Sequence, residues 1–257
     1  MTVPENQWQA TEYSQHAAFV SSMAADVVAL LEPQQGEAIL DLGCGDGEIG
    51  EYLQTQGCQL TCVDASASMI AAATNRGLVA RQLNGHQLDY ARQFDAVFSN
   101  AALHWMLEPE KVMSGVNKAL KKNGRFVAEM GGAGNIAALL KAISGVFKEN
   151  PGFGVFNNPW YFPDIATYSA LLVKAGFTVE SIALIPRPTP LKSGLIKWLE
   201  VFAGSITAQL NSKQKSLFFA EVEARLKADL YCEQGGWVAD YVRLRFKAIK
   251  HEEPGLY

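Results

Sequence analysis

A glycine-rich loop follows a short apolar run in the segment "AILDLGCGDGEIG", residues 38–50. Gly43, Gly45 and Gly47 alternate with other residues, and Asp41 lies near the end of the apolar run. Because glycine has no side chain, its backbone can turn sharply and can approach a ligand closely. The spacing therefore predicts a loop that holds a ligand against its backbone, directly after a buried strand.

Glu48 restricts which ligands this loop can hold. A dinucleotide-binding loop has its third glycine at this position, and a carboxylate there would oppose a pyrophosphate at a helix N-terminus. No Gly-Lys-Ser/Thr sequence follows, so the loop is not a P-loop either. These features indicate a ligand without phosphate, and Asp41 and Asp46 favour one that carries positive charge.

Polar residues also end the next two predicted strands. Asp64 is placed to accept hydrogen bonds from two vicinal ribose hydroxyls. Asn84 and the backbone N–H groups of Gly85 and His86, in "LNGHQL", can pair with an adenine edge. The three strand ends thus offer sites for an amino-acid tail, a ribose and an adenine, which together make S-adenosylmethionine.

The elements that must position these residues alternate along the chain. Apolar periodicity, helix caps and glycine stops predict strands and helices in turn. The predicted strands are 37–42, 59–64, 78–83, 94–100 and 125–130, and the predicted helices are 16–31, 48–57, 66–77 and 109–124. Such alternation indicates βαβ units around a parallel sheet, in which ligands bind beyond the carboxyl ends of the strands.

After Gly131 the pattern is less regular. We predict helices at 136–150 and 164–177, strands at 177–186 and 241–250, and between the two helices a loop rich in aromatic residues and proline. The basic run "VRLRFKAIK" alternates with apolar residues, so it predicts a strand whose basic face is solvated.

The composition excludes several classes of protein. The net charge of −4 over 257 residues gives no electrostatic footprint for a nucleic acid. The four cysteines, Cys44, Cys58, Cys62 and Cys232, have no zinc-binding spacing. The apolar stretch 17–31 is too short to span a bilayer, and the N-terminus does not resemble a signal peptide. We expect a cytoplasmic protein with reduced thiols and no metal, nucleic-acid or membrane partner; nothing in the sequence indicates an oligomeric state.

Five segments in order carry a family resemblance. "ILDLGCGDGEIG", "VDAS…MI", "LNGHQL", "FDAVFSNAALHW" and "LKKNGRFVAEM" resemble the successive motifs of class I S-adenosylmethionine-dependent methyltransferases, over roughly residues 35–130. The resemblance implies an α/β fold: a three-layer α-β-α Rossmann-like sheet of seven strands, whose last strand is antiparallel, with a helical cap. We expect a single domain over 1–257, with its core at about 33–131, 164–186 and 237–257 and its cap at 1–25, 132–162 and 187–236.

The resemblance also implies roles for individual residues. In that family the positions of Asp41 and Gly43 hold the methionine portion, and the position of Asp64 binds the ribose. Asn84 stands where the family usually has an aspartate that meets the adenine amino group, and it keeps an acceptor oxygen. Tyr13 lies on a segment that could close over the cofactor, although ordinary helix packing explains it equally well. The residues predicted to bind the cofactor are Asp41, Gly43, Cys44, Gly45, Asp64, Ala65, Met69, Asn84, Gly85, His86, Ser99, Asn100 and Tyr13.

The methyl acceptor is less directly indicated. "SNAALHWM", "EMGGAGNI" and "PWYFP" are most similar to trans-aconitate methyltransferase-like enzymes, which methylate small carboxylic acids, and malonyl-carrier-protein methyltransferases are a neighbouring possibility. His104 follows the fourth strand and could act as a base, donate to the acceptor, or only order its loop. A carboxylate acceptor would need a cation, for which Arg187, Lys192 and Lys197 are candidates. The residues predicted to contact the acceptor are His104, Trp105, Trp160, Tyr161, Arg187 and Trp198; packing in the core or cap is the alternative for each.

Two functions from different classes follow. The first is an enzyme that transfers a methyl group to a small-molecule acceptor, with S-adenosylhomocysteine as the product. The second is a non-catalytic module that binds S-adenosylmethionine or S-adenosylhomocysteine. The aromatic loop and the large cap favour the enzyme, because a sensor needs no acceptor pocket. Glu48 argues against a third possibility, an NAD-dependent oxidoreductase.

Overall fold

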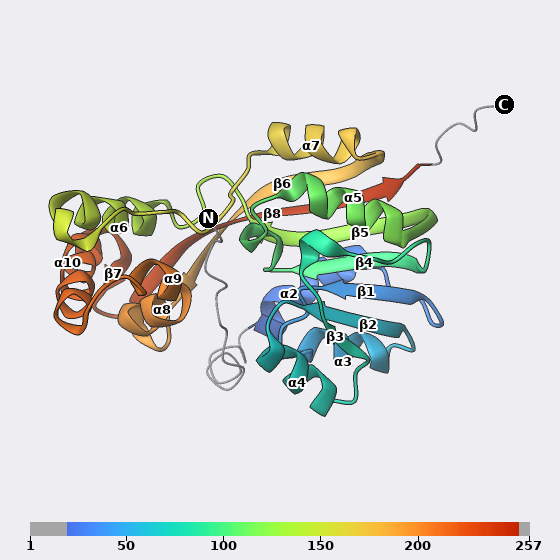
Figure 1. Cartoon of the computed structure of the whole chain (residues 1–257), viewed down its shortest axis with the longest axis horizontal. Coiled ribbons are helices and arrows are strands. Elements are labelled where there is room, and N and C mark those ends of the chain that lie inside the picture. Colours follow the sequence, from blue (N-terminus) through green and yellow to red (C-terminus); the bar gives the residue numbers. More distant parts are fainter. Residues whose placement is uncertain (1–19, 252–257) are drawn as a thin grey trace. The chain divides into compact units, whose positions relative to one another are not determined.

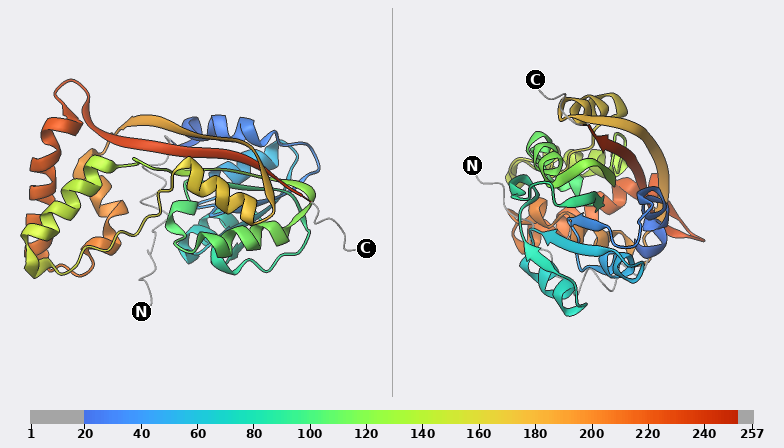
Figure 2. Two further views of the ribbon diagram at one scale, coloured as in Figure 1. Left: turned by 90° about the horizontal axis from the view of Figure 1, so that it is seen from above. Right: turned by 90° about the vertical axis from the view of Figure 1, so that its right-hand side faces the viewer.

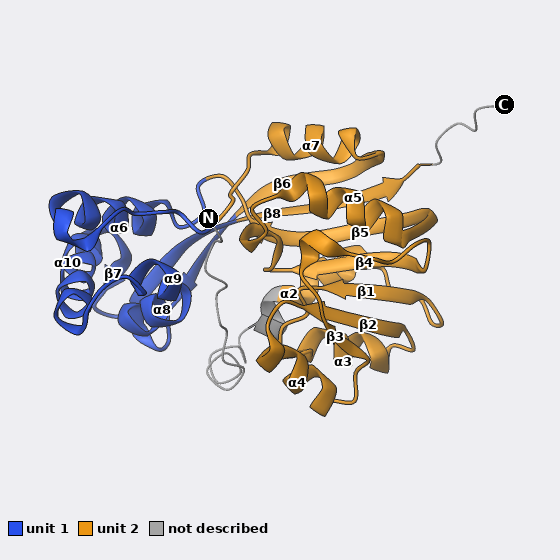
Figure 3. Ribbon diagram, in the orientation of Figure 1, with its two compact units in different colours: residues 1–7, 134–159, 186–242 blue, residues 8–133, 160–185, 243–257 orange. Residues whose placement is uncertain are grey.

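The computed structural model describes residues 20–251 and divides into two compact units (Figure 3). The sheet unit comprises residues 20–133, 160–185 and 243–251, and the helical unit comprises residues 134–159 and 186–242. The division of the chain into one domain with a core and a cap stays a prediction.

The main sheet has the strand order β3-β2-β1-β4-β5-β8-β6, and β7 pairs with β8 beside this path (Figure 1). Strands β1 to β5 are parallel to one another, and β8 is antiparallel to β5. Figure 2 shows the long strand β8, in red, running beside β6. The strands are β1 (Ala38–Leu42), β2 (Gln59–Asp64), β3 (Ala80–Gln82), β4 (Phe94–Asn100), β5 (Leu120–Gly131), β6 (Phe177–Pro190), β7 (Tyr231–Cys232) and β8 (Gly236–Lys250). This order confirms the predicted α/β fold class. The sequence of strands runs outward in one direction from β1 to β3 and in the other from β4, so the topological switch point lies between β1 and β4, which is where such sheets bind ligands.

Helices cover both faces of this sheet. One apolar cluster joins α2 (Val20–Leu31) and α3 (Glu48–Thr55) to β1, β2 and β4, with Leu31, Ile39 and Leu53 fully buried. A second cluster joins α5 (Pro109–Ala119) and α7 (Ile165–Lys174) to the opposite face, through Tyr168 and Phe246 among others. Helix α4 (Ala67–Asn75) and the short 3₁₀ helices η1 (Gly85–Gln87) and η2 (Leu103–Trp105) complete the sheet unit. The layers are those of a doubly wound α/β domain.

The helical unit is built around a pair of helices. In it α6 (Ala137–Glu149) packs against α10 (Ser212–Leu230), with the rings of Phe147 and Phe218 5.7 Å apart. Asn211 and Gln214 form a capping box at the start of α10, which fixes that helix end. The 3₁₀ helix η3 (Pro151–Phe153), α8 (Gly194–Phe202) and α9 (Gly204–Thr207) belong to the same unit. No helix between residues 20 and 251 combines the length and the apolar character that crossing a membrane requires.

Several predicted boundaries are wrong. The helix predicted at 109–124 ends at Ala119, because Leu120 is already the first residue of β5 and pairs with Phe94 of β4. The register between these two strands then shifts before Arg125. The third strand is shorter than predicted. Strand β6 continues past Pro186 and Pro188 and ends at Pro190. It is the last strand of the sheet, and an edge strand tolerates residues without an N–H donor.

The basic face of β8 is not solvated, so that prediction was also wrong. The side chains of Arg245 and Lys247 are only 15% and 16% exposed. Arg245 forms ion pairs with Glu129 of β5 and Asp26 of α2, and Lys247 forms one with Glu32 at the end of α2. The alternation is that of a strand, but a helix covers its basic face and supplies acids to it.

Candidate active site

The glycine loop after β1 is pressed against the loop after β4. Gly43 has φ +75°, and a Cβ added to it would lie 2.2 Å from the Cβ of Ala102. The N–H groups of Gly43 and Cys44 both donate to the carbonyl of Val63, at 2.8 and 3.1 Å. Only glycine fits at position 43, because the backbone is left-handed and the neighbouring chain is too close for any side chain.

The acidic residue inside this loop has a structural explanation. Asp46 is buried, and its Oδ2 atom lies 2.9 Å from Nη2 of Arg76, whose Nε donates to the Asp46 carbonyl at 2.9 Å. We interpreted Asp46 as favouring a positively charged ligand, but the cation that it binds is the protein's own Arg76. Gly47 allows α3 to pack, since a Cβ there would lie 2.6 Å from Cδ1 of Leu78.

Asp41 is a buried carboxyl group at the end of β1. It is 3% exposed, and no residue between 20 and 251 donates a hydrogen bond to its side chain. Burial, assisted by the negative charge of Asp64, raises its pKa to about 7. Because no hydrogen-bond donor or cation among these residues offsets the charge of this carboxylate, it fits a cationic ligand group, which would lower the free-energy cost of ionising it.

Asp64 is held in place by the backbone around it. Its Oδ2 accepts from the N–H of Gly45 at 3.0 Å, and its Oδ1 accepts from the N–H of Ser66 at 2.8 Å. Burial raises the pKa of this carboxyl group, and the backbone hydrogen bonds oppose that shift. Each carboxylate oxygen keeps a further lone pair, so Asp64 can still accept from two hydroxyl groups. Of its neighbours, Ala65 is exposed and Met69 is buried in α4.

Asn84 is engaged with its own loop. Its Oδ1 caps η1 by accepting from the N–H of His86 at 3.0 Å, and it lies 2.7 Å from Nδ1 of His86. The Nε2 atom of His86 accepts from the N–H of Glu108 at 3.3 Å, so the proton of this neutral imidazole belongs on Nδ1. A Cβ on Gly85 would lie 2.6 Å from Sδ of Met106, which fixes the backbone of this turn closely. The side-chain oxygen of Asn84 already has these two partners within its own loop. Its role as the acceptor for the adenine amino group remains a prediction.

Three further predicted cofactor residues lie at the same edge of the sheet. Ser99 is fully buried, and its hydroxyl donates to the carbonyl of Leu42 at 2.7 Å, which joins β4 to β1. The pKa of the Cys44 thiol is raised, through its hydrogen bond with Cys62 and through burial, so it is a protonated thiol. Asn100 is half-buried at the end of β4. The hydrogen bond to Leu42 explains the buried hydroxyl of Ser99 without a cofactor contact. Cofactor binding by Ser99, Cys44 and Asn100 stays a prediction.

His104 is a buried, neutral imidazole. Its Nδ1 accepts from the N–H of Gly131 at 3.2 Å, which leaves the ring proton on Nε2. Burial and the positive charge of Arg243 lower its pKa to about 3. At neutral pH this side chain can therefore donate a hydrogen bond through Nε2, but it is a poor general base.

An aromatic cluster surrounds His104. The ring of His104 lies 5.6 Å from that of Trp105 and 5.8 Å from that of Phe162. Trp160 stacks on Phe162 with centroids 6.1 Å apart, and it meets Trp105 edge-on at 5.4 Å. The structure thus brings together three of the predicted acceptor residues, and it adds Phe162, which we missed although it lies in the quoted "PWYFP" motif.

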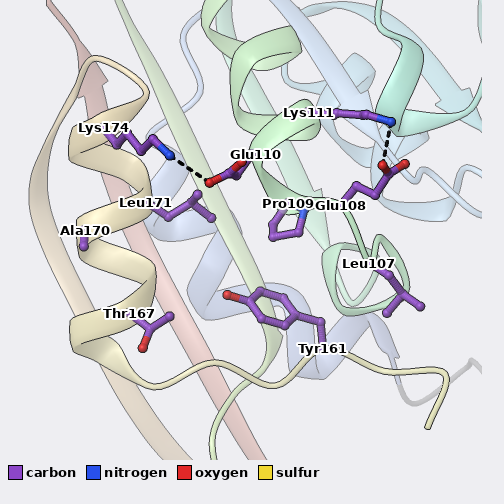
Figure 4. Close-up of a pocket in the computed structure, with 10 residues that line it drawn as sticks. All are labelled: Leu107, Glu108, Pro109, Glu110, Lys111, Tyr161, Thr167, Ala170, Leu171 and Lys174. Carbon is purple, nitrogen blue, oxygen red and sulfur yellow. Dashed lines mark hydrogen bonds and ion pairs between the residues drawn. The ribbon is translucent and has the colours of Figure 1, made fainter. Parts of the chain in front are cut away.

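Tyr161 lies apart from this cluster. Its N–H donates to the carbonyl of His104 at 2.8 Å, but its side chain lines an open groove of about 580 Å³ between α5 and α7 (Figure 4). An ion pair between Lys174 and Glu110, 2.9 Å long, links the two helices at this groove. The backbone of Tyr161 therefore holds the aromatic loop, while its ring takes no part in the cluster.

The other predicted residues are placed differently. Trp198 and Arg187 belong to the helical unit, where Nε1 of the buried Trp198 donates to the hydroxyl of Tyr241 at 2.6 Å. Arg187 is half-buried on β6. Tyr13 lies outside the described residues. Within residues 20–251 no group of three or more His, Cys, Asp and Glu side chains could hold a metal ion.

Comparisons with known proteins agree with this geometry. Residues 40–128 match the family model described as "Methyltransferase domain". The chain is 36% identical over 263 residues to the uncharacterized methyltransferase C70.08c of Schizosaccharomyces pombe, covering 96% of this chain and 100% of that protein. It is 27% identical to the trans-aconitate 2-methyltransferase of Deinococcus radiodurans, covering 95% of this chain and 99% of that enzyme.

A solved structure shares the fold. The phosphoethanolamine N-methyltransferase 2 of Haemonchus contortus, in complex with S-adenosyl-L-methionine, superposes with a TM-score of 0.58 at 19% identity, over 90% of this chain and 53% of that one. The glycine loop, the two carboxyl groups at the ends of β1 and β2 and the full-length relatives point to the same cofactor. The chain belongs to the class I S-adenosylmethionine-dependent methyltransferases, and S-adenosylmethionine is its cofactor.

Proposed function

We propose that this methyltransferase acts on a carboxylate oxygen of a small organic acid. The carboxylate oxygen attacks the methyl carbon, the bond from that carbon to sulfur breaks, and the products are a methyl ester and S-adenosylhomocysteine. The relative from Deinococcus radiodurans, whose name gives trans-aconitate as its acceptor, matches along nearly the whole chain and supports this class of acceptor.

The protonation state of His104 carries the proposal. Amine, phenol and carbon-acid acceptors must lose a proton, so they need a general base near the methyl group. His104 has a pKa of about 3, and its Nδ1 is occupied by the Gly131 N–H, so it is poorly suited to that task. A carboxylate with an ordinary pKa is already ionised at neutral pH and needs no base. Alignment of the two reactants then supplies most of the catalysis.

The site residues have distinct roles in this proposal. The carboxylate of Asp41 binds the ammonium group of the cofactor, and Asp64 binds its ribose hydroxyls. The backbone N–H group of Gly85 faces the adenine, whereas that of His86 is already bound to Oδ1 of Asn84. The Nε2–H of His104 donates to the acceptor carboxylate and orients it.

The walls of the acceptor site are aromatic in this proposal. Trp105 and Trp160 exclude water from the reacting atoms, and their ring faces favour the sulfonium by cation–π attraction.

Alkaline lability of the product tests the proposal. The protein is incubated with methyl-labelled S-adenosylmethionine and a panel of small acids, phenols and amines, with trans-aconitate as the first acid. We expect label in the acid samples only, and we expect mild alkali to release it as methanol, because an ester hydrolyses there and an N-methyl or O-aryl methyl group does not. Label that survives alkali would contradict a methyl ester.

Two further arms separate the alternatives. Malonate on a carrier protein is compared with the free acids, and a strong preference for the carrier-bound form would assign the protein to the malonyl-carrier-protein type. Calorimetry with S-adenosylmethionine is run in parallel. Tight cofactor binding without transfer to any acceptor would instead indicate a binding module.

A further inference from the structure

The loop between β1 and α3 has little conformational restraint of its own. Gly43, Gly45 and Gly47 alternate along it, and all three have positive φ, of +75°, +57° and +84°. Because glycine populates many backbone conformations, a loop of this composition needs contacts from other segments to hold one of them. Contacts at Asp46, which lies between two of these glycines, are therefore important for the shape of the loop.

Arg76 supplies such contacts from another part of the chain. It is the C-cap residue of α4 and lies 30 residues after Asp46. Its Nε donates to the carbonyl of Asp46 at 2.9 Å, and its Nη2 lies 2.9 Å from the Oδ2 atom of the same residue. One guanidinium thus binds both the backbone and the side chain of Asp46, and this fixes the orientation of that residue as well as its position.

Asp46 is buried, so this attachment has a physical consequence. The residue is 6% exposed, and its other side-chain oxygen, Oδ1, accepts from the N–H of Glu48 at 3.3 Å. A buried carboxylate that loses its cation lowers its free energy by turning toward water. The glycines on either side let the backbone follow, so removal of Arg76 should shift the loop.

The carboxylate of Asp64 depends on the same loop. Its Oδ2 accepts from the N–H of Gly45 at 3.0 Å, and its Oδ1 accepts from the N–H of Ser66 at 2.8 Å. Ser66 is two residues from Asp64 and belongs to the same turn, whereas Gly45 belongs to the glycine loop. A shift of the loop would therefore release one oxygen of the carboxylate that is assigned to the ribose hydroxyls.

We infer that Arg76 is a positioning residue for S-adenosylmethionine: it holds the glycine loop through Asp46, and the loop holds Asp64 in the orientation that the ribose hydroxyls require. No contact between Arg76 and the cofactor is needed. The inference rests on the predicted role of Asp64 toward the ribose. It goes beyond the proposed function, because it concerns the cofactor and does not depend on which acceptor is methylated.

Cofactor binding by substituted proteins tests the inference. Arg76→Met should raise the dissociation constant for S-adenosylmethionine about 10-fold, the value for loss of one charge-assisted hydrogen bond at the ribose. Arg76→Lys should raise it less, since a cation remains near Asp46 but the fork that binds carbonyl and carboxylate together is lost. Calorimetry measures both values. An unchanged dissociation constant in Arg76→Met would overturn the inference.

Glu51→Gln is the matched control. Glu51 is a further partner of Arg76, 2.8 Å from its Nη1 atom, and its side chain on α3 is 46% exposed. This variant changes a contact of the same guanidinium without touching the loop, so cofactor affinity should change less than about twofold. A loss as large as that in Arg76→Met would assign the effect to the junction of α3 and α4 and would overturn the inference.

A double-mutant cycle shows whether Arg76 acts through Asp64. In an Asp64→Ala protein the carboxylate that Arg76 positions is absent, so adding Arg76→Met should change the dissociation constant less than about twofold. A residue that only stabilised the fold, or that supported another part of the cofactor site, would lower affinity by the same factor in both backgrounds. Equal factors would therefore contradict the inference. Arg76→Lys, which leaves a cation beside Asp46, serves in the same cycle if Arg76→Met does not fold.

Hydrogen exchange gives a readout that needs no ligand. In the free protein Arg76→Met should accelerate exchange of the Gly45 amide, which Asp64 accepts, more than that of the Gly43 amide, which donates to the carbonyl of Val63. NMR follows both amides in the folded protein. A protein that is only less stable overall would show equal acceleration at the two amides. That result, or unaltered exchange at Gly45, would overturn the link between Arg76 and Asp64.

Discussion

At the ends of β1, β2 and β3, near neighbours in the chain hold the polar groups. The carboxylate of Asp64 accepts from Gly45, 19 residues away, and Asn84 accepts from His86, two residues away. At the ends of β4, β5 and β8 the partners are distant: Arg245 reaches Glu129 across 116 residues and Asp26 across 219. The first group, the cofactor edge, is thus built from compact motifs, and the second, the acceptor edge, is built by the tertiary fold.

This difference predicts different responses to substitution. A change at the cofactor edge should act on a single loop, and its effect should depend on the space around that loop. A change at the acceptor edge should remove a contact between elements that are far apart in sequence, so it should weaken the whole sheet unit.

The largest expected effect is on stability, at the acceptor edge. Arg245→Met should lower the free energy of unfolding by about 3–5 kcal/mol, because Glu129 is 3% exposed and would lose its cation. Urea denaturation measures the loss. Adding Glu129→Gln should recover part of it, since the buried carboxylate is then removed together with the cation that faces it.

Arg225→Met is the matched control for this prediction. Arg225 forms ion pairs with Glu149 and Glu221, whose side chains are 65% and 30% exposed, so that its removal should change stability little. If Arg245→Met costs no more than Arg225→Met, the ion pairs of the acceptor edge do not hold the elements together.

A glycine substitution gives the next largest effect, at the cofactor edge. Gly43→Ala should destabilise the protein by roughly 2–4 kcal/mol, from the left-handed backbone together with the clash at Ala102. Gly36→Ala is the comparison, since Gly36 has φ +84° and nothing within 4 Å of an added Cβ. It should cost only about 1–2 kcal/mol, the value for the backbone alone. Equal losses would show that the close approach at Ala102 does not constrain the loop.

The same difference explains what could be predicted from the sequence. The alternation of strands and helices, the cofactor and the places of Asp41 and Asp64 near strand ends follow from short motifs in which spacing along the chain reflects spacing in the structure. Arg243 and Glu129 could not be identified in that way. An alternating basic strand has the same sequence pattern whether its cations face water or the acids of α2. The cross-strand register that places Arg243 opposite Gly131 cannot be predicted from the sequence of either strand alone.

Local pattern also misled at particular residues. The position of Asp46 between two glycines predicts a contact with a positively charged ligand, yet its cation is Arg76, 30 residues later. Tyr161 and Trp160 are adjacent in one aromatic motif, yet their rings face a groove and the His104 cluster respectively. In each case the deciding partner comes from another part of the chain.

Cofactor binding at Asp41 should depend on pH. Its pKa of about 7 lies above the ordinary value, so the folded protein keeps a proton that the unfolded chain loses above about pH 4. Stability from this group is therefore present at low pH and is lost as the pH rises through 7. The affinity for S-adenosylmethionine should change in the opposite direction. It should increase up to about tenfold per unit from pH 5 to 7, because the cofactor's ammonium requires the ionised carboxylate.

Calorimetry at several pH values measures this dependence. The isosteric variant Asp41→Asn should bind the cofactor more weakly at pH 7.5 and should lose most of the pH dependence below 7. A pH dependence that persists in Asp41→Asn would assign the titration to another group and would leave Asp41 as a packing residue of the cofactor edge.

At the acceptor edge, by contrast, turnover should be insensitive to the titration of His104. The pKa of about 3 lies far below the working range, so kcat for an acid acceptor should show no inflection from an imidazole between pH 5 and 8. His104→Asn offers an oxygen to the Gly131 N–H but lacks the Nε2–H donor. It should lower kcat while leaving cofactor affinity unchanged. An inflection near pH 6.5 in the wild-type profile that disappears in His104→Asn would instead make His104 a base. The acceptor would then be a group that must lose a proton, because a carboxylate has none to give up at that pH.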